Sequence, residues 1–296
     1  MKAKRRGKPV ARGVRGAGGA KRSYRSAWAA ARDPKQSVKN RVAALAGLSQ
    51  AVCDDDAMLQ GALKILRDTA EPIAVRLAVL QAMQAASFSA RRFAACRPAY
   101  LAALRSVVAD PDTELRQRAL GLLAREHDSY AQQRLIEGLK KPAKALVPPE
   151  KALQLLSYDI HADAYPLARE IARKPPNPAA KREALRLLAA DARSVPAFEK
   201  ILRNKNEVPE IRQLAASALH SLAPGKLQAR ARAIVLDRSE DDEIKATSLT
   251  ALTHFGDAEA VAKDVTLQKQ VDRLKGTAGS GELKRAARRF DSKYRR

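Results

Sequence analysis

The sequence predicts an all-α protein: a right-handed α-solenoid of about seven stacked helix pairs with basic, flexible termini. One apolar stripe recurs along the chain, and its copies follow one another at intervals of 31 to 40 residues. Aromatic residues make up only 4% of the chain, and its apolar residues are mostly Ala, Leu and Val. Such a composition suits closely packed helices. The length of 296 residues is long for one compact domain and fits an extended repeat array.

The stripe is clearest in "DPDTELRQRALGLLARE", residues 110–126. Its apolar residues occupy positions i, i+4, i+7 and i+8, which share one face of an α-helix. Apolar stripes at 59–66 and 195–202 predict a partner helix within each unit. No such unit can bury its apolar face without its neighbours, which is the reason for predicting a solenoid. Seven segments carry the stripe: 38–46, 75–83, 115–123, 148–156, 180–188, 211–219 and 244–252.

Several units also place an acidic residue, often a proline, and then a hydrophobic-basic pair at the start of the striped helix. The clearest examples are "DPDTELRQRALGLL", "EPIAVRLAVLQAM", "VPEIRQLAASAL" and "DDEIKATSLTAL". Over about residues 33–274 this pattern resembles the HEAT-repeat family. The units are shorter than typical members and are similar to the HEAT-like repeats of bacterial bilin-lyase subunits. The resemblance concerns the repeats and not an activity.

The resemblance implies a hydrogen-bonded ladder in which an Asp and a basic residue join neighbouring units. Two pairs keep the family's full spacing, Asp33 with Lys39 and Asp110 with Arg116. In two other units Asn206 and Ser239 stand where the family has Asp, and Pro149 replaces the basic residue, so we expect irregular stacking near residues 142–149. The further basic members of the ladder are expected to be Arg76, Arg212 and Lys245.

The formal charge of +24 is concentrated at the two ends of the chain. Residues 1–32 contribute +11 without an acidic residue, and residues 269–296 contribute +7. We therefore expect a disordered basic arm at 1–25, the solenoid at 26–274, and a linker with a basic amphipathic helical tail at 275–296. The residues expected to bind a polyanion are Lys2, Lys4, Arg5, Arg6, Lys8, Arg12, Arg15, Lys21, Arg22, Lys284, Arg285, Arg288 and Arg289.

The tail leaves three alternatives open. "GTAGSGE" predicts a flexible linker, and the apolar residues between Leu283 and Tyr294 share one helical face. This helix could dock as a terminal cap, fold on an acidic partner, or lie on nucleic acid. At the other end, Tyr24 and Trp28 share a helical face that we expect to cover the first unit. The alternative role for these rings is that of the aromatic residues with which HEAT-like DNA glycosylases meet a damaged nucleotide.

The sequence contains no recognisable catalytic constellation. Its four histidines stand singly, and it has no metal-ligand spacing, phosphate-binding loop or nucleophile elbow. We therefore predict a non-enzymatic protein without metal or cofactor. Cys53 and Cys96 match no redox or metal motif and are expected to be buried thiols in a reducing compartment. No apolar run is long enough for a membrane span, so we expect a cytoplasmic protein, with a mitochondrial transit peptide as the alternative reading of residues 1–32.

Helix geometry indicates which positions face away from the buried stripe. These positions are almost all neutral and small or hydrogen-bonding, unlike a groove built for a phosphate backbone. Some of the small residues could instead serve the close approach of neighbouring helices. We predict a monomeric interaction scaffold that binds an unidentified protein partner here, with the basic termini adding electrostatic capture. The alternative is a sequence-nonspecific DNA- or RNA-binding protein that uses the basic tails. The predicted inner-face residues are Gln117, Gly121, Gln154, Arg182, Arg186, Gln213 and Ser217.

Overall fold

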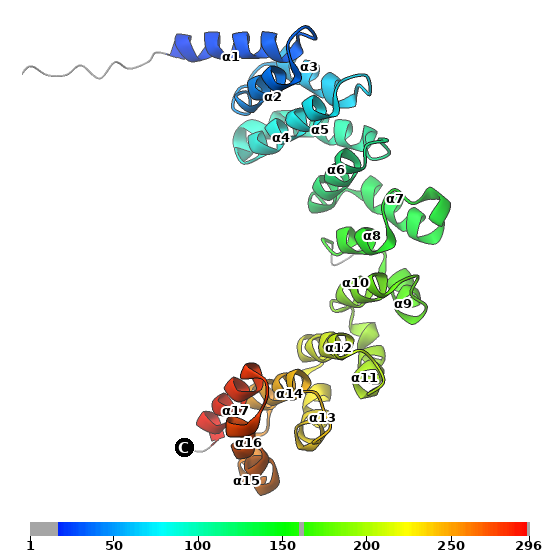
Figure 1. Ribbon diagram of the computed structural model, residues 1–296, viewed down its shortest axis with the longest axis vertical. Helices are drawn as coiled ribbons and strands as arrows, with labels where there is room; N and C mark the ends of the chain where they lie inside the picture. Colours follow the sequence, from blue (N-terminus) through cyan, green and yellow to red (C-terminus); the bar gives the residue numbers. More distant parts are fainter. Residues whose placement is uncertain (1–16, 160–162, 295–296) are drawn as a thin grey trace, which may run out of the picture. The chain divides into compact units, whose positions relative to one another are not determined.

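The computed structural model describes residues 17–159 and 163–294, with side chains from residue 23 onward. These residues form 17 α-helices, two short 3-10 helices and no strand (Figure 1). Helices that are neighbours in the sequence pack as pairs. The predicted all-α fold of successive packed helix pairs is confirmed.

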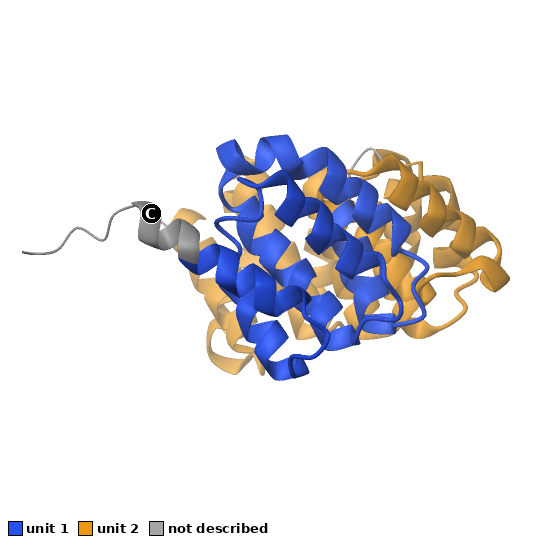
Figure 2. Ribbon diagram, turned by 90° about the horizontal axis from the view of Figure 1, so that it is seen from above, with its two compact units in different colours: residues 1–123 blue, residues 124–296 orange. Residues whose placement is uncertain are grey.

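The chain divides into two compact units, residues 1–123 and 124–296 (Figure 2). Within the first unit α2 packs against α4 and α3 against α5, while α1 covers α2 and contacts α3. The polypeptide therefore builds two layers, one from each set of alternate helices. The helices are α1 (Ala17–Arg32), α2 (Val38–Ala46), α3 (Asp56–Arg67), α4 (Ile73–Ser87), α5 (Ala90–Ser106) and α6 (Thr113–Arg125), the last of which crosses the boundary.

The second unit repeats this arrangement. Four successive pairs, α7 with α8, α9 with α10, α11 with α12 and α13 with α14, bring the even-numbered helices into one row. The segment expected to stack irregularly holds a 3-10 turn, Pro142–Lys144, before α8 begins. The helices are α7 (Ser129–Lys140), α8 (Pro149–Leu156), α9 (Tyr165–Arg173), α10 (Pro178–Leu188), α11 (Val195–Arg203), α12 (Pro209–Leu222), α13 (Pro224–Leu236), α14 (Asp242–Phe255), α15 (Ala258–Lys263), α16 (Val265–Thr277) and α17 (Gly281–Tyr294), with a second 3-10 turn at Ala192–Ser194.

The seven predicted stripes correspond to the even-numbered helices from α2 to α14, which we call the second helices. In six of them the stripe lies largely in the core. The first differs, because Val38 is 40% exposed and the buried residues of α2 are Arg41 and Leu45. Here the buried basic residue is Arg41, two positions beyond the predicted Lys39, which is exposed. The predicted C-terminal tail helix, α17, packs on α14 and α16 and extends the row by one helix.

The N-terminal helix corrects one predicted boundary. Residues 17–25, which we assigned to a disordered arm, belong to α1. The other predicted arm residues, 1–16, lie outside the described part of the chain. Trp28 of α1 packs on α3 at Gly61, where a Cβ atom would lie 2.5 Å from the Trp28 ring. The expectation that Trp28 covers the first unit is therefore confirmed.

Gly61→Ala should loosen this contact and destabilise the first unit by about 1–3 kcal/mol, because the added methyl group overlaps the indole of Trp28. Trp28 is the only tryptophan, so its fluorescence during urea unfolding measures the change directly. The matched control is Gly276→Ala in α16, where nothing lies within 4 Å of the new Cβ. That change should stabilise its helix by up to about 1 kcal/mol. Equal behaviour of the two variants would contradict the proposed packing.

A ladder of buried arginines joins successive helix pairs within each compact unit. Arg41, Arg76 and Arg212 each donate from Nε to a backbone carbonyl ten residues earlier, at distances of 2.8 to 3.0 Å. The carbonyls lie near the ends of the preceding helices, where helical hydrogen bonding leaves acceptors unused. The same guanidinium groups bind a carboxylate before the next second helix. These ion pairs are Arg41 with Glu71, Arg76 with Asp110, and Arg212 with Glu240.

This ladder differs from the predicted one in its partners. The carboxylate of Asp110 binds Arg76 of the preceding helix pair, whereas Arg116 donates to the backbone carbonyl of Asp110 at 2.6 Å. Asp33 accepts from the backbone N–H of Lys35, and it forms no ion pair with Lys39, which is exposed. The acidic positions were misread by one residue in two helix pairs. Glu207, next to Asn206, binds Lys181 at 2.5 Å, and Glu240, next to Ser239, binds Arg212 at 2.6 Å. Lys245 is buried and lies 3.9 Å from Asp242.

Acid should weaken this ladder. Burial alone would raise the pKa of Glu240, but hydrogen bonds from Arg212 and from the backbone N–H of Asp241 outweigh burial and lower it below its ordinary value of 4.5. The folded state therefore binds fewer protons than the unfolded state as the pH falls through this range. The stabilisation present at neutral pH should be lost progressively below about pH 4.5 to 5. Urea unfolding between pH 7 and pH 3 should show a smaller loss of stability for Glu240→Gln than for the native chain.

The two cysteines correct another expectation. Cys53 and Cys96 form a disulfide with a Cα–Cα distance of 5.8 Å. It joins the loop between α2 and α3 to α5, so these residues are not free thiols. The compartment that we inferred from free thiols loses its support. Sequence spacing could not reveal this pairing, because two cysteines separated by 43 positions match no recognisable motif.

Candidate functional site

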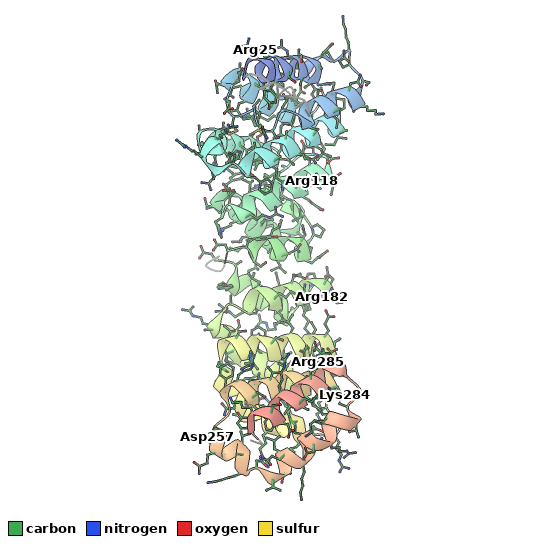
Figure 3. All side chains as sticks on the ribbon, turned by 90° about the vertical axis from the view of Figure 1, so that its left-hand side faces the viewer. Arg25, Arg118, Arg182, Asp257, Lys284 and Arg285 are labelled. Carbon is green, nitrogen blue, oxygen red and sulfur yellow. A yellow bond between two sulfur atoms is a disulfide. The ribbon has the colours of Figure 1, made fainter. Side chains whose placement is uncertain are left out.

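The predicted inner-face residues lie on the second helices, with Gln117 and Gly121 on α6 in a surface that is partly exposed. In the second unit, Gln154 lies on α8 and accepts from Lys151. Arg182 and Arg186 lie on α10 and form ion pairs with Glu210 and Glu183. Figure 3 labels Arg182 of α10 together with Lys284 and Arg285 of α17.

The C-terminal helix docks as a cap, which is the first of the three alternatives. Its apolar face, from Leu283 to Phe290, is buried against α14 and α16. Tyr294 donates from its hydroxyl to the Leu252 carbonyl at 2.8 Å, and Lys275 of α16 binds Asp291 at 2.7 Å. The linker expected to be flexible is an ordered turn, because Asp242 accepts backbone N–H bonds from Gly279 and Ser280.

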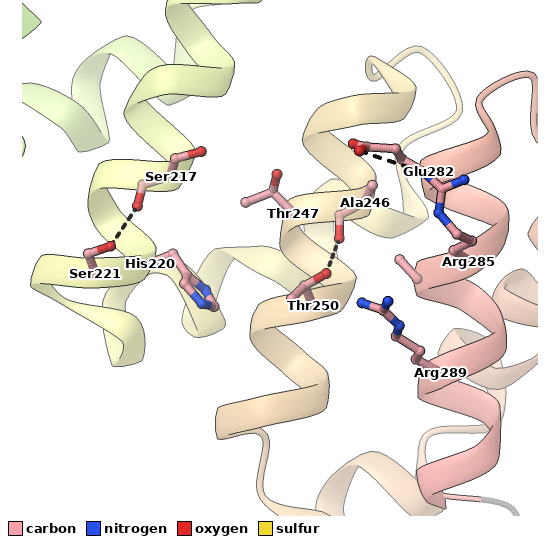
Figure 4. A pocket seen from close by; sticks show the side chains of 10 residues that line it. Ser217, His220, Ser221, Ala246, Thr247, Thr250, Glu282, Arg285 and Arg289 are labelled. Atoms are coloured by element: carbon pink, nitrogen blue, oxygen red, sulfur yellow. Dashed lines mark hydrogen bonds and ion pairs between the residues drawn. The ribbon is translucent and has the colours of Figure 1, made fainter. Parts of the chain in front are cut away.

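This docking brings two predicted sites together. A cavity of about 520 Å³ lies between α12, α14 and α17 (Figure 4). We call it the C-terminal groove. One wall carries Ser217, a predicted inner-face residue, and the opposite wall carries Arg285 and Arg289, predicted polyanion-binding residues. The other lining residues are His220, Ser221, Ala246, Thr247, Thr250, Glu282 and Ala286.

Not all predicted basic residues reach the groove. Arg288 is exposed on another face of α17, where it lines an open depression with Arg289, Ser292 and Lys293. Lys284 is half-buried and does not line the groove. Lys21 and Arg22 belong to α1, but their side chains are not described, and the arm residues Lys2, Lys4, Arg5, Arg6, Lys8, Arg12 and Arg15 lie outside the described residues.

The hydroxyl groups on α12 and α14 form the wall of the C-terminal groove opposite α17, and their hydrogen bonds determine what this wall offers a ligand. Thr247 and Thr250 donate to carbonyls of their own helix, and Thr247 also accepts from Gln213 at 2.7 Å. Ser221 donates to the carbonyl of Ser217. The Thr250 and Ser221 oxygens consequently face a ligand as hydrogen-bond acceptors. Positive charge in the groove comes from α17.

His220 stands between this wall and a small aromatic cluster. Its ring lies 5.3 Å from that of Phe255 and 6.5 Å from that of His254, centroid to centroid. Burial, and then the neighbouring His254, lower the pKa of His220 below its ordinary value of 6.5. Its Nδ1 atom is buried and has no hydrogen-bond partner in the described part of the chain. A neutral imidazole therefore presents an unsatisfied polar atom in this wall.

Sequence reasoning found only part of this site. His220 and Thr250 are among the positions that helix geometry places away from the buried stripe, but nothing in the sequence distinguished them from the equivalent positions of other helix pairs. Glu282 and Ala286 were missed because the docking partner of α17 could not be deduced from its own amphipathic pattern. The residue that could have indicated this docking partner was Asp242 of α14, whose carboxylate accepts the backbone N–H bonds of the turn at 279–280.

The described residues hold no group of three or more His, Cys, Asp or Glu side chains placed to bind a metal ion. Among the same residues, no helix combines the length and the apolar character required to traverse a bilayer.

No protein-family model matches the chain, and no curated protein matches it. Among solved structures it is similar to a chain in the complex of CpcE and CpcF of phycocyanin lyase from Nostoc sp. PCC7120. The sequence identity is 18%, the TM-score is 0.39, and the alignment covers 98% of this chain and 99% of that chain. It is also similar to a designed armadillo repeat protein, at 14% identity and a TM-score of 0.27, over 91% of this chain and 98% of that chain.

Proposed function

We propose that this protein is a non-enzymatic interaction scaffold that binds a segment of a partner protein along the second helices of its second unit. The observation that carries the proposal is the C-terminal groove, where the neutral second-helix surface meets the exposed arginines of α17. A cavity of about 520 Å³ is large enough to receive several side chains. The neutral wall supplies shape and hydrogen-bond acceptors, and α17 supplies electrostatic attraction.

The test is capture of proteins from nuclease-treated extract of the native host by the immobilised full chain. The double variant Gln154→Tyr with Ser217→Tyr places bulk at two exposed positions of this surface. It should lose the proteins that the native chain retains. The control, Ala229→Tyr, adds the same bulk at an exposed position of α13 and should retain them. Unchanged capture by the double variant would reject the second-helix surface as the binding site.

The second candidate function, nonspecific nucleic-acid binding, is favoured by one observation. Arg288, Arg289 and Lys293 line an open depression on α17 with Ser292. A protein that neutralises about six phosphates should lose roughly a thousandfold in affinity between 50 and 200 mM salt. Binding of a labelled oligonucleotide with that salt dependence, abolished by Arg288→Gln with Lys293→Gln, would support this function. Salt-independent binding, or no binding at 50 mM salt, would reject it.

A further inference from the structure

The C-terminal groove has the charge and spacing to recognise a particular kind of partner segment. We propose that it binds an extended acidic peptide whose two anionic side chains, two residues apart, pair with Arg285 and Arg289. This inference rests on the proposed scaffold function and specifies the partner's chemistry at one site.

The two arginines of the groove differ from the closely ion-paired arginines of the second unit. Arg212 and Arg232 bind carboxylates at 2.6 and 2.5 Å. Arg289 is exposed and forms no ion pair with any described residue, and the carboxylate of Glu282 lies 3.7 Å from Arg285 with both side chains more than 60% exposed. The guanidinium donors of Arg285 and Arg289 therefore remain open to a ligand, and a carboxylate is the partner they match best.

The spacing of the arginines sets the spacing of their ligands. Residues four apart on a helix lie on the same face, about 6 Å apart along its axis. In an extended peptide, side chains two residues apart point to the same side and lie about 6.6 Å apart. A Glu-x-Glu segment running beside α17 therefore presents one carboxylate to each arginine. Adjacent carboxylates point to opposite sides and cannot do so.

The remainder of the groove favours a peptide over a nucleic-acid strand. Its ten lining residues include no Phe, Tyr or Trp, and the partly buried ring of His220 packs against Phe255, so the groove lacks a broad aromatic platform on which bases could stack. Glu282 at the edge repels a phosphate backbone, which carries one charge per nucleotide, more than a peptide with two separated carboxylates, and it can accept a peptide N–H bond. Thr250 and Ser221 offer further acceptors, and Ala246 and Ala286 supply apolar surface for the intervening side chain.

The experiment measures fluorescence anisotropy of a labelled ten-residue Gly/Ser peptide containing Glu-Ala-Glu, titrated with the full chain. We expect saturable binding with a dissociation constant below about 1 mM. Glu-Glu-Ala and Gln-Ala-Gln peptides should bind at least about tenfold more weakly, since each charge-assisted hydrogen bond contributes a factor of that size. Arg285→Gln and Arg289→Gln should each weaken binding of the Glu-Ala-Glu peptide by about tenfold.

The matched control is Arg288→Gln, which removes the same charge from the same helix outside the groove. It should change the affinity less than about threefold, because a charge outside the groove acts only through solvent. Equal weakening by Arg288→Gln and Arg289→Gln would overturn the proposal, as would equal affinity for all peptides. A single-stranded oligonucleotide that binds more tightly than the peptide, and is weakened by Arg289→Gln, would also overturn it.

Failure here can be told apart from failure of the scaffold function. If the native chain captures host proteins and Gln154→Tyr with Ser217→Tyr loses them, but no acidic peptide binds, the scaffold function stands and the acidic segment is rejected. If the peptide binds with the expected dependence on Arg285 and Arg289, both are supported.

Discussion

Replacing Arg212 with methionine should destabilise the second unit by about 3–5 kcal/mol. The side chains of Arg212 and Glu240 are only 6% and 4% exposed. Two hydrogen bonds of 2.7 and 2.6 Å join their charged groups, and Arg212 also satisfies the carbonyl of Leu202. Methionine fills similar space but leaves a buried carboxylate and a buried carbonyl without their donor. Urea unfolding followed by far-ultraviolet circular dichroism measures the loss.

Two variants separate the ladder from ordinary surface charge. Arg182→Met breaks an ion pair with Glu210 whose side chains are 35% and 57% exposed, and should cost at most about 1 kcal/mol. Adding Glu240→Gln to Arg212→Met removes the stranded charge and should restore part of the lost stability. If Arg212→Met lowers the free energy of unfolding no more than Arg182→Met does, the buried arginine does not join neighbouring helix pairs as described.

Removal of the disulfide should have the second large effect. Cys53 and Cys96 are 43 positions apart, and a closed loop of this length restricts the unfolded chain by an amount worth about 4 kcal/mol in the entropic treatment. The variant Cys53→Ser with Cys96→Ser should therefore destabilise the first unit by about 2–4 kcal/mol. The urea midpoint of Trp28 fluorescence, which reports on this unit, provides the measurement.

A reducing agent supplies the internal control for this prediction. Dithiothreitol should lower the midpoint of the native chain toward that of the double serine variant and leave the variant itself unchanged. A native chain whose midpoint does not respond to the reductant, and that retains two free thiols under denaturing conditions, would show that the bond is absent.

The fold was largely predictable because its signal is local and repeated. The stripes from Val75 to Leu252 each appear as a second helix, since a helix in a repeat array must bury one face wherever it lies. The first helix pair was misread because the residue that binds its carboxylate is Arg41, whereas Lys39 occupies the position that the repeat pattern predicts. The ladder partners were misread for a related reason: Glu240 has a longer side chain than Asp110 and reaches its arginine from one residue closer to the helix.

The candidate site was less predictable because it depends on contacts between distant segments. Ser217 and Arg289 were both singled out, but for different surfaces, and only the docking of α17 on α14 brings them to one groove. An amphipathic helix shows that it needs an apolar partner and does not show which one. The disulfide illustrates the same limit, because two cysteines far apart in sequence carry no information about their distance in space.

Hydrogen exchange of the amides in α17 of the free full chain tests the central claim most directly, because both the row of second helices and the groove require this helix to be docked. We expect the amides around Ala287 and Phe290 to exchange at least about a hundredfold more slowly than in an isolated peptide of residues 279–296, comparably with those of α14. Exchange of these amides at the rate of the isolated peptide would contradict the account.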